Sequence, residues 1–233
     1  MPKVMLGLVF CALVSVSAGA AKPVPTAERK VVGEAETFEL VPALTASHRG
    51  SDGQQVWSER ISRPGASFLK VHFVDLNLQP GDELALINSF GRVVETLTGR
   101  GPKDRGTFWG LSGQGDSMVL RFTFDKPYRS PPFRIDRLMV GNAALTAPKT
   151  ESGARSICSP ADFEDSVCYE QDSGKWDVAR ASVGVMSVGG NAATSLFCSG
   201  SNVSGSNAIL TNQHCVENQA VCDNTEFGFD AYT

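Results

Sequence analysis

Short stretches of alternating apolar and polar residues run through the middle of the chain, from residue 55 to residue 141. Clusters of Gly, Pro, Asp and Ser separate these stretches at intervals of roughly 8–12 residues, and no window has the period of an amphipathic helix. This pattern is typical of an antiparallel β-sandwich or jelly roll. The predicted strands are Phe68–Leu78, Glu83–Phe90, Arg92–Leu97, Met118–Phe124 and Phe133–Val140.

The first of these strands has two distinct faces. Leu69, Val71 and Phe73 alternate with Lys70 and His72. Successive side chains of a strand point to opposite faces, so the apolar set is predicted to be buried and the polar pair exposed.

The C-terminal third also has strand-like segments, at residues 181–186, 195–200, 207–216 and 226–232. We therefore predict an all-β fold, in which an N-terminal antiparallel β-sandwich (jelly roll) precedes a second, incomplete β-barrel. The predicted organisation is a signal peptide at 1–20, a polar leader at 21–54, the β-sandwich at 55–141, a linker at 142–156 and the C-terminal segment at 157–233.

The N-terminus has the three parts of a secretory signal. Lys3 supplies the positive charge, Val4–Val16 is an uninterrupted apolar run, and Ala18-Gly19-Ala20 offers small residues for cleavage. The alternative is a membrane anchor, but ~13 apolar residues are too few to span a bilayer that needs roughly 20. We expect a secreted protein with no membrane span.

Composition excludes other classes of protein. The chain has 233 residues, 42% of them apolar, and a formal net charge of −4. It is too apolar for a disordered chain and too acidic for an electrostatic binder of nucleic acid. From Thr150 onward there are 3 basic and 11 acidic residues, against 18 basic and 14 acidic before it. Opposite charges on the two parts would favour docking of one on the other.

Five of the six cysteines follow the signal peptide, which contains Cys11. An odd number in an oxidising compartment implies a partner that is missing or lies in another molecule. The five are Cys158, Cys168, Cys198, Cys215 and Cys222.

Of the three histidines, His214 has the most informative neighbours. It follows the apolar segment Ala208–Thr211, adjoins Cys215, and lies close after Cys198. A disulfide in this hairpin would hold the imidazole in a fixed position, as a general base requires. The alternative, a structural disulfide that merely adjoins a histidine, stays open. His48 lies in the polar leader and is expected to be solvated.

The segments Cys198–Ser201 and Ala208–Cys215 resemble the catalytic-histidine region of trypsin-like (chymotrypsin-fold) serine endopeptidases. The secreted lysyl endopeptidase group is the closer match, because Cys158, Cys168 and Arg180–Gly184 resemble the start of its mature enzymes. The resemblance covers about residues 155 to 233. It implies peptide-bond hydrolysis through a Ser/His/Asp triad, with a protein or peptide as substrate and no metal or cofactor.

The resemblance also implies individual roles. His214 would be the general base and Cys198–Cys215 the histidine-loop disulfide. In the resembling enzymes the two early cysteines pair with cysteines later in the chain, and Cys168–Cys222 is the one further bond that this sequence itself offers. Asn212-Gln213 departs from the small residues that the family usually has there.

The other triad members are not found. Asp223 and Asp230 follow the histidine too closely, and Gly115-Asp116-Ser117 precedes it by about a hundred residues and is predicted to be a turn. We therefore expect a protease domain truncated at its C-terminus, and a chain that is inactive as it stands.

The N-terminal part resembles the jelly-roll or CUB-like domains that precede such proteases, as a propeptide or an appended binding module. Lys149 and Arg155 are candidate processing sites, or simply linker charges. Asn202 begins a glycosylation sequon, which applies if the source is eukaryotic.

The alternative to the protease is a non-catalytic secreted β-module that binds protein or glycan and carries a degenerate protease-like tail. Its contact residues would be Trp57, Phe108 and Trp109, unless these aromatic side chains pack in the core.

Overall fold

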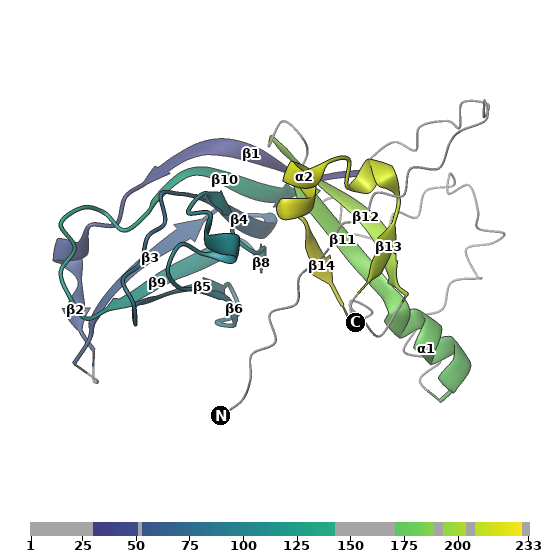
Figure 1. Cartoon of the computed structure of the whole chain (residues 1–233), viewed down its shortest axis with the longest axis horizontal. Coiled ribbons are helices and arrows are strands. Elements are labelled where there is room, and N and C mark those ends of the chain that lie inside the picture. Colours follow the sequence, from purple (N-terminus) through teal and green to yellow (C-terminus); the bar gives the residue numbers. More distant parts are fainter. Residues whose placement is uncertain (1–29, 51–52, 143–170, 189–192, 204–207, 230–233) are drawn as a thin grey trace.

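A computed structural model describes the chain over residues 30–50, 53–142, 171–188, 193–203 and 208–229 (Figure 1). Nearly all regular structure in these ranges is strand, so the prediction of an all-β fold is confirmed. The predicted signal peptide and most of the predicted linker lie outside the described residues. Within the described ranges, no helix combines the length and the apolar character needed to cross a membrane.

Two antiparallel sheets form the N-terminal sandwich. The smaller sheet has the order β2-β3-β9-β5-β6. Its strands are β2 (His48–Arg49), β3 (Gln55–Ser62), β5 (Glu83–Asn88), β6 (Val93–Leu97) and β9 (Ser117–Phe124).

The larger sheet has the order β14-β11-β12-β1-β10-β4-β7 and so continues from the sandwich into the C-terminal segment. Its sandwich strands are β1 (Lys30–Leu40), β4 (Ala66–Val74), β7 (Phe108–Trp109) and β10 (Arg134–Asn142), with β8 (Gly113–Gln114) paired to β4. Its C-terminal strands are β11 (Ser182–Val188), β12 (Thr194–Asn202) and β14 (Glu226–Gly228), with β13 (Ile209–Thr211) paired to β12. The helical elements are α1 (Ser173–Ala181), α2 (Gln219–Asp223) and the 3₁₀ turns η1 (Leu44–Ala46), η2 (Pro102–Asp104) and η6 (Gln213–Cys215).

The strand β1 joins the two parts of the molecule and lies within the predicted polar leader. It pairs with β10 on one side and with β12 on the other, and in Figure 1 it runs along the top of the sandwich to the C-terminal strands. Its residues alternate poorly because the pairing register shifts between Val31 and Gly33 and again between Thr37 and Leu40. A simple period of two therefore did not reveal this strand.

The sandwich core fills the space between the two sheets. Phe73 and Phe133 pack edge to face with ring centroids 5.9 Å apart, which is a favourable geometry for an aromatic pair. Trp57 and Phe108 belong to this core, and Trp109 packs in a second cluster. With exposed fractions of 4%, 3% and 7%, these three aromatic residues are core residues and offer no contact surface.

The prediction that Lys70 and His72 are exposed is wrong. Lys70 is 2% exposed and His72 8%, although they lie on the face of β4 opposite the sandwich core. Trp109 covers His72, and Glu226 of the C-terminal strand β14 pairs with Lys70. Alternation along β4 could not predict this burial, because the covering residues come from elsewhere in the chain.

Candidate functional site

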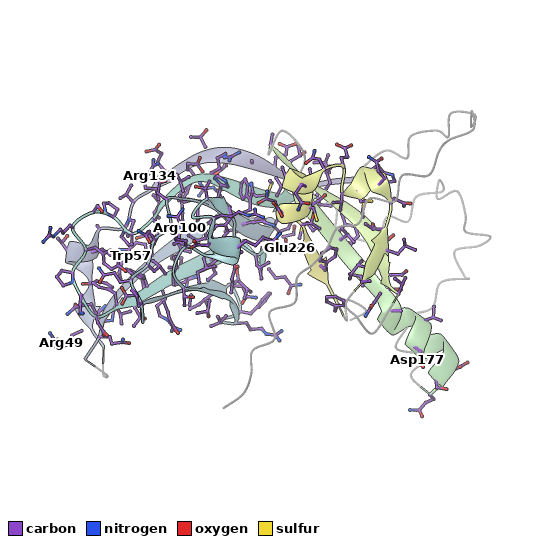
Figure 2. All side chains as sticks on the ribbon, in the orientation of Figure 1. Arg49, Trp57, Arg100, Arg134, Asp177 and Glu226 are labelled. Atoms are coloured by element: carbon purple, nitrogen blue, oxygen red, sulfur yellow. A yellow bond between two sulfur atoms is a disulfide. The ribbon has the colours of Figure 1, made fainter. Side chains whose placement is uncertain are left out.

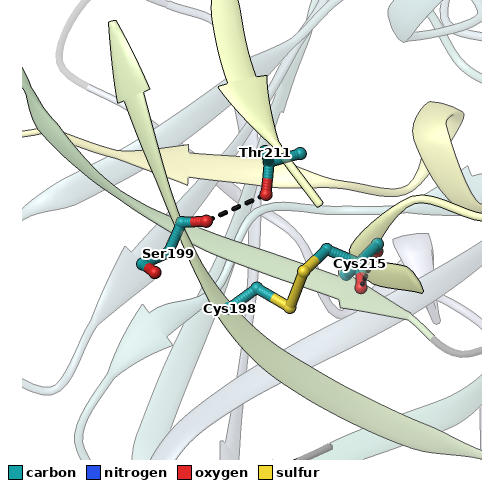
Figure 3. Close-up of a disulfide and its surroundings, with 5 residues drawn as sticks. Cys198, Ser199, Thr211 and Cys215 are labelled. Atoms are coloured by element: carbon teal, nitrogen blue, oxygen red, sulfur yellow. Dashed lines mark hydrogen bonds between the residues drawn. A yellow bond between two sulfur atoms is a disulfide. The ribbon is translucent and has the colours of Figure 1, made fainter. Parts of the chain in front are cut away.

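A disulfide joins Cys198 of β12 to Cys215 of η6 (Figure 3). Nearby, Oγ1 of Thr211 donates a hydrogen bond of 2.9 Å to the Ser199 carbonyl. The buried hydroxyl of Ser187 donates to the Cys215 carbonyl at 3.0 Å. The covalent bond and these hydrogen bonds hold η6 against β11 and β12.

His214 lies on η6, beside this disulfide. The strand predicted over residues 207–216 is shorter in the structure, because β13 ends at Thr211 and a 3₁₀ turn follows. The side chain of His214 is half-buried, and its ligand nitrogen lies within 4.8 Å of both cysteine sulfurs. Because these sulfurs are bonded to each other, only the imidazole is available to a metal in this state.

Of the two aspartates that follow His214 as candidates, the structure describes Asp223, and Asp230 lies outside the described residues. The carboxylate of Asp223 lies 2.7 Å from Lys103 Nζ and 2.7 Å from Arg105 Nη2. The hydrogen bond from Lys103 lowers the pKa of this carboxyl group. Asp223 therefore pairs with the sandwich and does not orient the imidazole.

The segment Gly115-Asp116-Ser117 is a turn, as predicted. Gly115 has φ of +95°, a conformation that glycine adopts readily, and β9 starts at Ser117. The hydroxyl of Ser117 is buried and receives a hydrogen bond of 3.1 Å from Arg60 Nη1. This serine is part of the packing between strands.

The other predicted site residues are dispersed. Asn202 is the exposed last residue of β12, and Cys222 lies in α2. His48 is exposed on β2, as expected. Five of the residues named in the sequence analysis lie outside the described residues: Lys149, Arg155, Cys158, Cys168 and Asp230.

A second candidate site is a groove where the C-terminal strands meet the smaller sheet, which we call the junction groove. Its volume is about 520 Å³, and its apolar wall includes Val93, Phe197 and Phe227, whose exposed fractions are 52%, 47% and 38%. The full lining consists of Asn88, Arg92, Val93, Val94, Ser112, Gln114, Gly184, Met186, Phe197, Glu226, Phe227 and Gly228.

Charged side chains anchor the junction groove. Lys70 Nζ lies 3.2 Å from Glu226 Oε1, and Ser112 donates to the same carboxylate through its hydroxyl and through its backbone N–H at 2.9 Å. Glu95 of β6 accepts a hydrogen bond of 2.7 Å from the Leu111 N–H, and burial raises the pKa of its carboxyl group. These contacts fix β14 and β6 in relation to the sandwich.

The junction groove is flanked by two sheet edges. β14 ends the larger sheet and β6 ends the smaller one, so each has one side that pairs with no strand among the described residues. Gly184 and Gly228 pair across β11 and β14 and bring no side chains to the groove. Glycines in strands often mark places where another backbone approaches closely.

Sequence reasoning did not find this groove. Val93 and Phe227 each lie in a segment predicted to be a strand, but they are 134 positions apart, and no motif links them. The sequence offered only a local indication of the groove, namely two predicted strands with apolar residues that are not buried in the core.

No family model matches the chain, so the resemblance to trypsin-like endopeptidases stays a prediction. An isomalto-dextranase from Arthrobacter globiformis T6, solved with panose, aligns with 42% of this chain and 18% of its own, at 9% identity and a TM-score of 0.18. The chain is 27% identical over 180 residues to secreted RxLR effector protein 73 of Plasmopara viticola, an alignment that covers 73% of this chain and 44% of that relative. The relative is a secreted protein, and secretion is also what the signal-like N-terminus of this chain predicts.

Proposed function

We propose that the chain is a secreted, non-catalytic β-module that binds an extended segment of a partner protein in the junction groove. The observation that carries this proposal is the position of two sheet edges, β14 and β6, on either side of one apolar groove. Unpaired strand edges are templates for the addition of a further strand. An extended peptide would gain main-chain hydrogen bonds at an edge and bury alternate side chains in the groove.

The lining of the groove defines the chemistry of the partner segment. Phe197 and Phe227 suit apolar side chains, and burying one such side chain contributes about 1.5–3 kcal/mol. Glu226 is already neutralised by Lys70, whereas the exposed Arg92 forms no ion pair with another described residue. The groove therefore favours a mainly apolar segment with a carboxylate placed near Arg92.

The proposal is tested with peptides selected against the purified secreted chain from a phage-displayed random library and measured by fluorescence polarisation. Phe227→Ala should weaken binding about tenfold, which corresponds to about 1.4 kcal/mol. Phe229→Ala is the matched control, because Phe229 is 53% exposed and lies outside the groove lining. Equal loss in both variants, or no selected peptide that depends on Phe227, would contradict the proposal.

A second candidate function is that of a trypsin-like endopeptidase precursor, and the specific observation in its favour is the position of His214 beside the Cys198–Cys215 disulfide. This function requires an aspartate and a serine from a remainder of the catalytic domain that these 233 residues do not include. The 233-residue chain by itself should then leave lysyl and arginyl ester substrates uncleaved. Turnover that disappears in His214→Ala would show that this chain is itself catalytic and would overturn the non-catalytic proposal.

A further inference from the structure

A pocket of about 820 Å³ opens at one end of the sandwich, between the loops at residues 75–80 and 127–134. We call it the end pocket. It is separate from the junction groove: Figure 2 shows Arg134, at its rim, on the sandwich side of the molecule, and Glu226 where the sandwich meets the C-terminal strands. The two sites share no lining residue.

The two loops that form the end pocket are tied together. The Asn77 N–H donates to the Pro132 carbonyl at 2.8 Å, and the Gln79 N–H donates to the Tyr128 hydroxyl at 2.7 Å. That hydroxyl in turn donates to the carboxylate of Asp82, which is 2% exposed. Backbone and buried side-chain bonds thus give the pocket a fixed shape before any ligand binds.

Asp75 at the pocket rim has an unusual backbone conformation. Its φ of +56° lies in the left-handed region, which costs a non-glycine residue free energy. Its carboxylate accepts a hydrogen bond of 3.1 Å from Arg134 Nη2. Both side chains are largely exposed, so this pair is weak and Arg134 remains able to bind a competing anion.

Several polar side chains of the pocket form no hydrogen bond or ion pair with the rest of the described chain. These are the amides of Asn77 and Gln79, the guanidinium of Arg129 and the hydroxyl of Ser130. Their backbones are fixed while their side chains stay available to solvent. The amides offer both donors and acceptors, and Arg129 offers a planar set of donors that matches a carboxylate.

We propose that the end pocket binds an acidic saccharide, in which sugar rings carry carboxylates. Arg129 and Arg134 would each take a carboxylate, and the amides of Asn77 and Gln79 would bind ring hydroxyls. The exposed proline rings of the rim supply the apolar surface that the C–H faces of a sugar require: Pro80, Pro127 and Pro131. Arg129 and Arg134 outnumber Asp75, so the lining has a net positive charge that favours an anionic ligand over a neutral one.

The test uses a fluorescently labelled oligogalacturonate and the purified secreted chain at low ionic strength. Arg129→Gln should weaken binding about tenfold or more, because a charge-assisted bidentate contact is lost. Arg121→Gln is the matched control, since Arg121 is an exposed arginine of β9 outside the pocket. Asn77→Ala should also weaken binding of the oligosaccharide. The midpoint of thermal unfolding of this variant should stay close to that of the wild type, which shows that the loss of binding is not a loss of folding.

Two further ligands test whether the pocket recognises the carboxylates and the sugar rings together. The methyl-esterified form of the same oligosaccharide should bind much more weakly, because its carboxylates are neutral. Equal binding of the esterified form, or of a hexaglutamate peptide, would overturn the assignment to acidic saccharides. Failure of oligogalacturonate to bind, or equal loss in Arg121→Gln and Arg129→Gln, would overturn the site itself. None of these outcomes depends on peptide binding in the junction groove.

Discussion

Lys70 Nζ lies 3.2 Å from Glu226 Oε1, and the side chain of Lys70 is only 2% exposed. This ion pair connects β4 of the sandwich to β14, the last described strand of the chain, across 156 positions of sequence. Because β14 forms one wall of the junction groove, the pair links the shape of the groove to the packing of the sandwich.

The first prediction concerns this pair. Lys70→Met leaves the Glu226 carboxylate, whose side chain is 14% exposed, with only the donors of Ser112. Breaking a largely buried pair in this way costs about 3 kcal/mol of unfolding free energy. Lys70→Met combined with Glu226→Leu should recover part of the loss, because the carboxylate that lost its partner is removed with it. Urea denaturation of the single variant, the double variant and the wild type measures both changes in the unfolding free energy.

A control for the ion pair is the exposed pair of Arg134 and Asp75. Asp75→Asn should change the unfolding free energy by less than about 1 kcal/mol, as is usual for surface pairs. If Lys70→Met cost no more than Asp75→Asn, the buried pair would not be holding β14 in place.

His72 gives a pH-dependent prediction. Its Nδ1 lies 2.6 Å from Asp136 Oδ1 and 3.2 Å from Arg137 Nη2, and burial, reinforced by Arg137 and opposed by Asp136, lowers the pKa of the imidazole below its ordinary 6.5. The unfolded chain therefore takes up a proton near pH 6.5 before the folded chain does. The contribution of His72 to stability is full above that pH and decreases as the pH falls below it.

The measurement is urea denaturation at about pH 7.5 and about pH 5.5, where the loss from one group can reach about 1.4 kcal/mol per pH unit. His72→Gln should reduce the difference between the two pH values. His48→Gln, at an exposed position of β2, should leave that difference as it is. An unchanged difference in His72→Gln would mean that the imidazole takes up its proton over the same pH range in the folded and unfolded states.

The disulfide gives a third prediction. Cys198 and Cys215 are 17 positions apart, and closing a loop of this size stabilises a fold by about 3 kcal/mol. Replacing both cysteines by serine should lower the unfolding free energy by about that amount. Comparable stability of the oxidised wild type and the double variant would show that η6 is held by packing alone.

Gly33 gives a fourth prediction. A Cβ atom there would lie 2.9 Å from Phe68 Cζ and 3.0 Å from the Val140 carbonyl oxygen. Gly33→Ala should therefore cost about 1–3 kcal/mol, since the backbone of β10 cannot move aside easily. At Gly228 the atom nearest to an added Cβ, the Gly184 carbonyl oxygen, is 4.0 Å away, so Gly228→Ala should destabilise the fold much less. Thermal unfolding of the two variants and the wild type measures the difference.

The sequence predicts the sandwich strands well because most of them have one buried face and one polar face. It does not predict β1, whose alternation is interrupted by two register shifts. It also misplaces Lys70, because the partner that buries this lysine lies on a distant strand. Local periodicity reports the faces of one strand, whereas burial of the second face depends on which segments pack against it.

The candidate sites differ in the same way. His214 and Cys198 are close in sequence, so their proximity can be predicted from a short motif. The junction groove depends on the meeting of β6 and β14, and the end pocket on two loops that start 52 positions apart. Neither leaves a motif in the sequence, because each is made by tertiary packing of ordinary residues.

Amide hydrogen exchange with and without a selected peptide tests the central claim most directly. If the peptide adds to a sheet edge at the junction groove, exchange should slow at the amides of β14 or β6. The amides of β2, an edge strand of the smaller sheet that does not line the groove, should exchange as before. Protection at β2, or no added protection at β14 and β6 while the peptide is bound, would contradict the account.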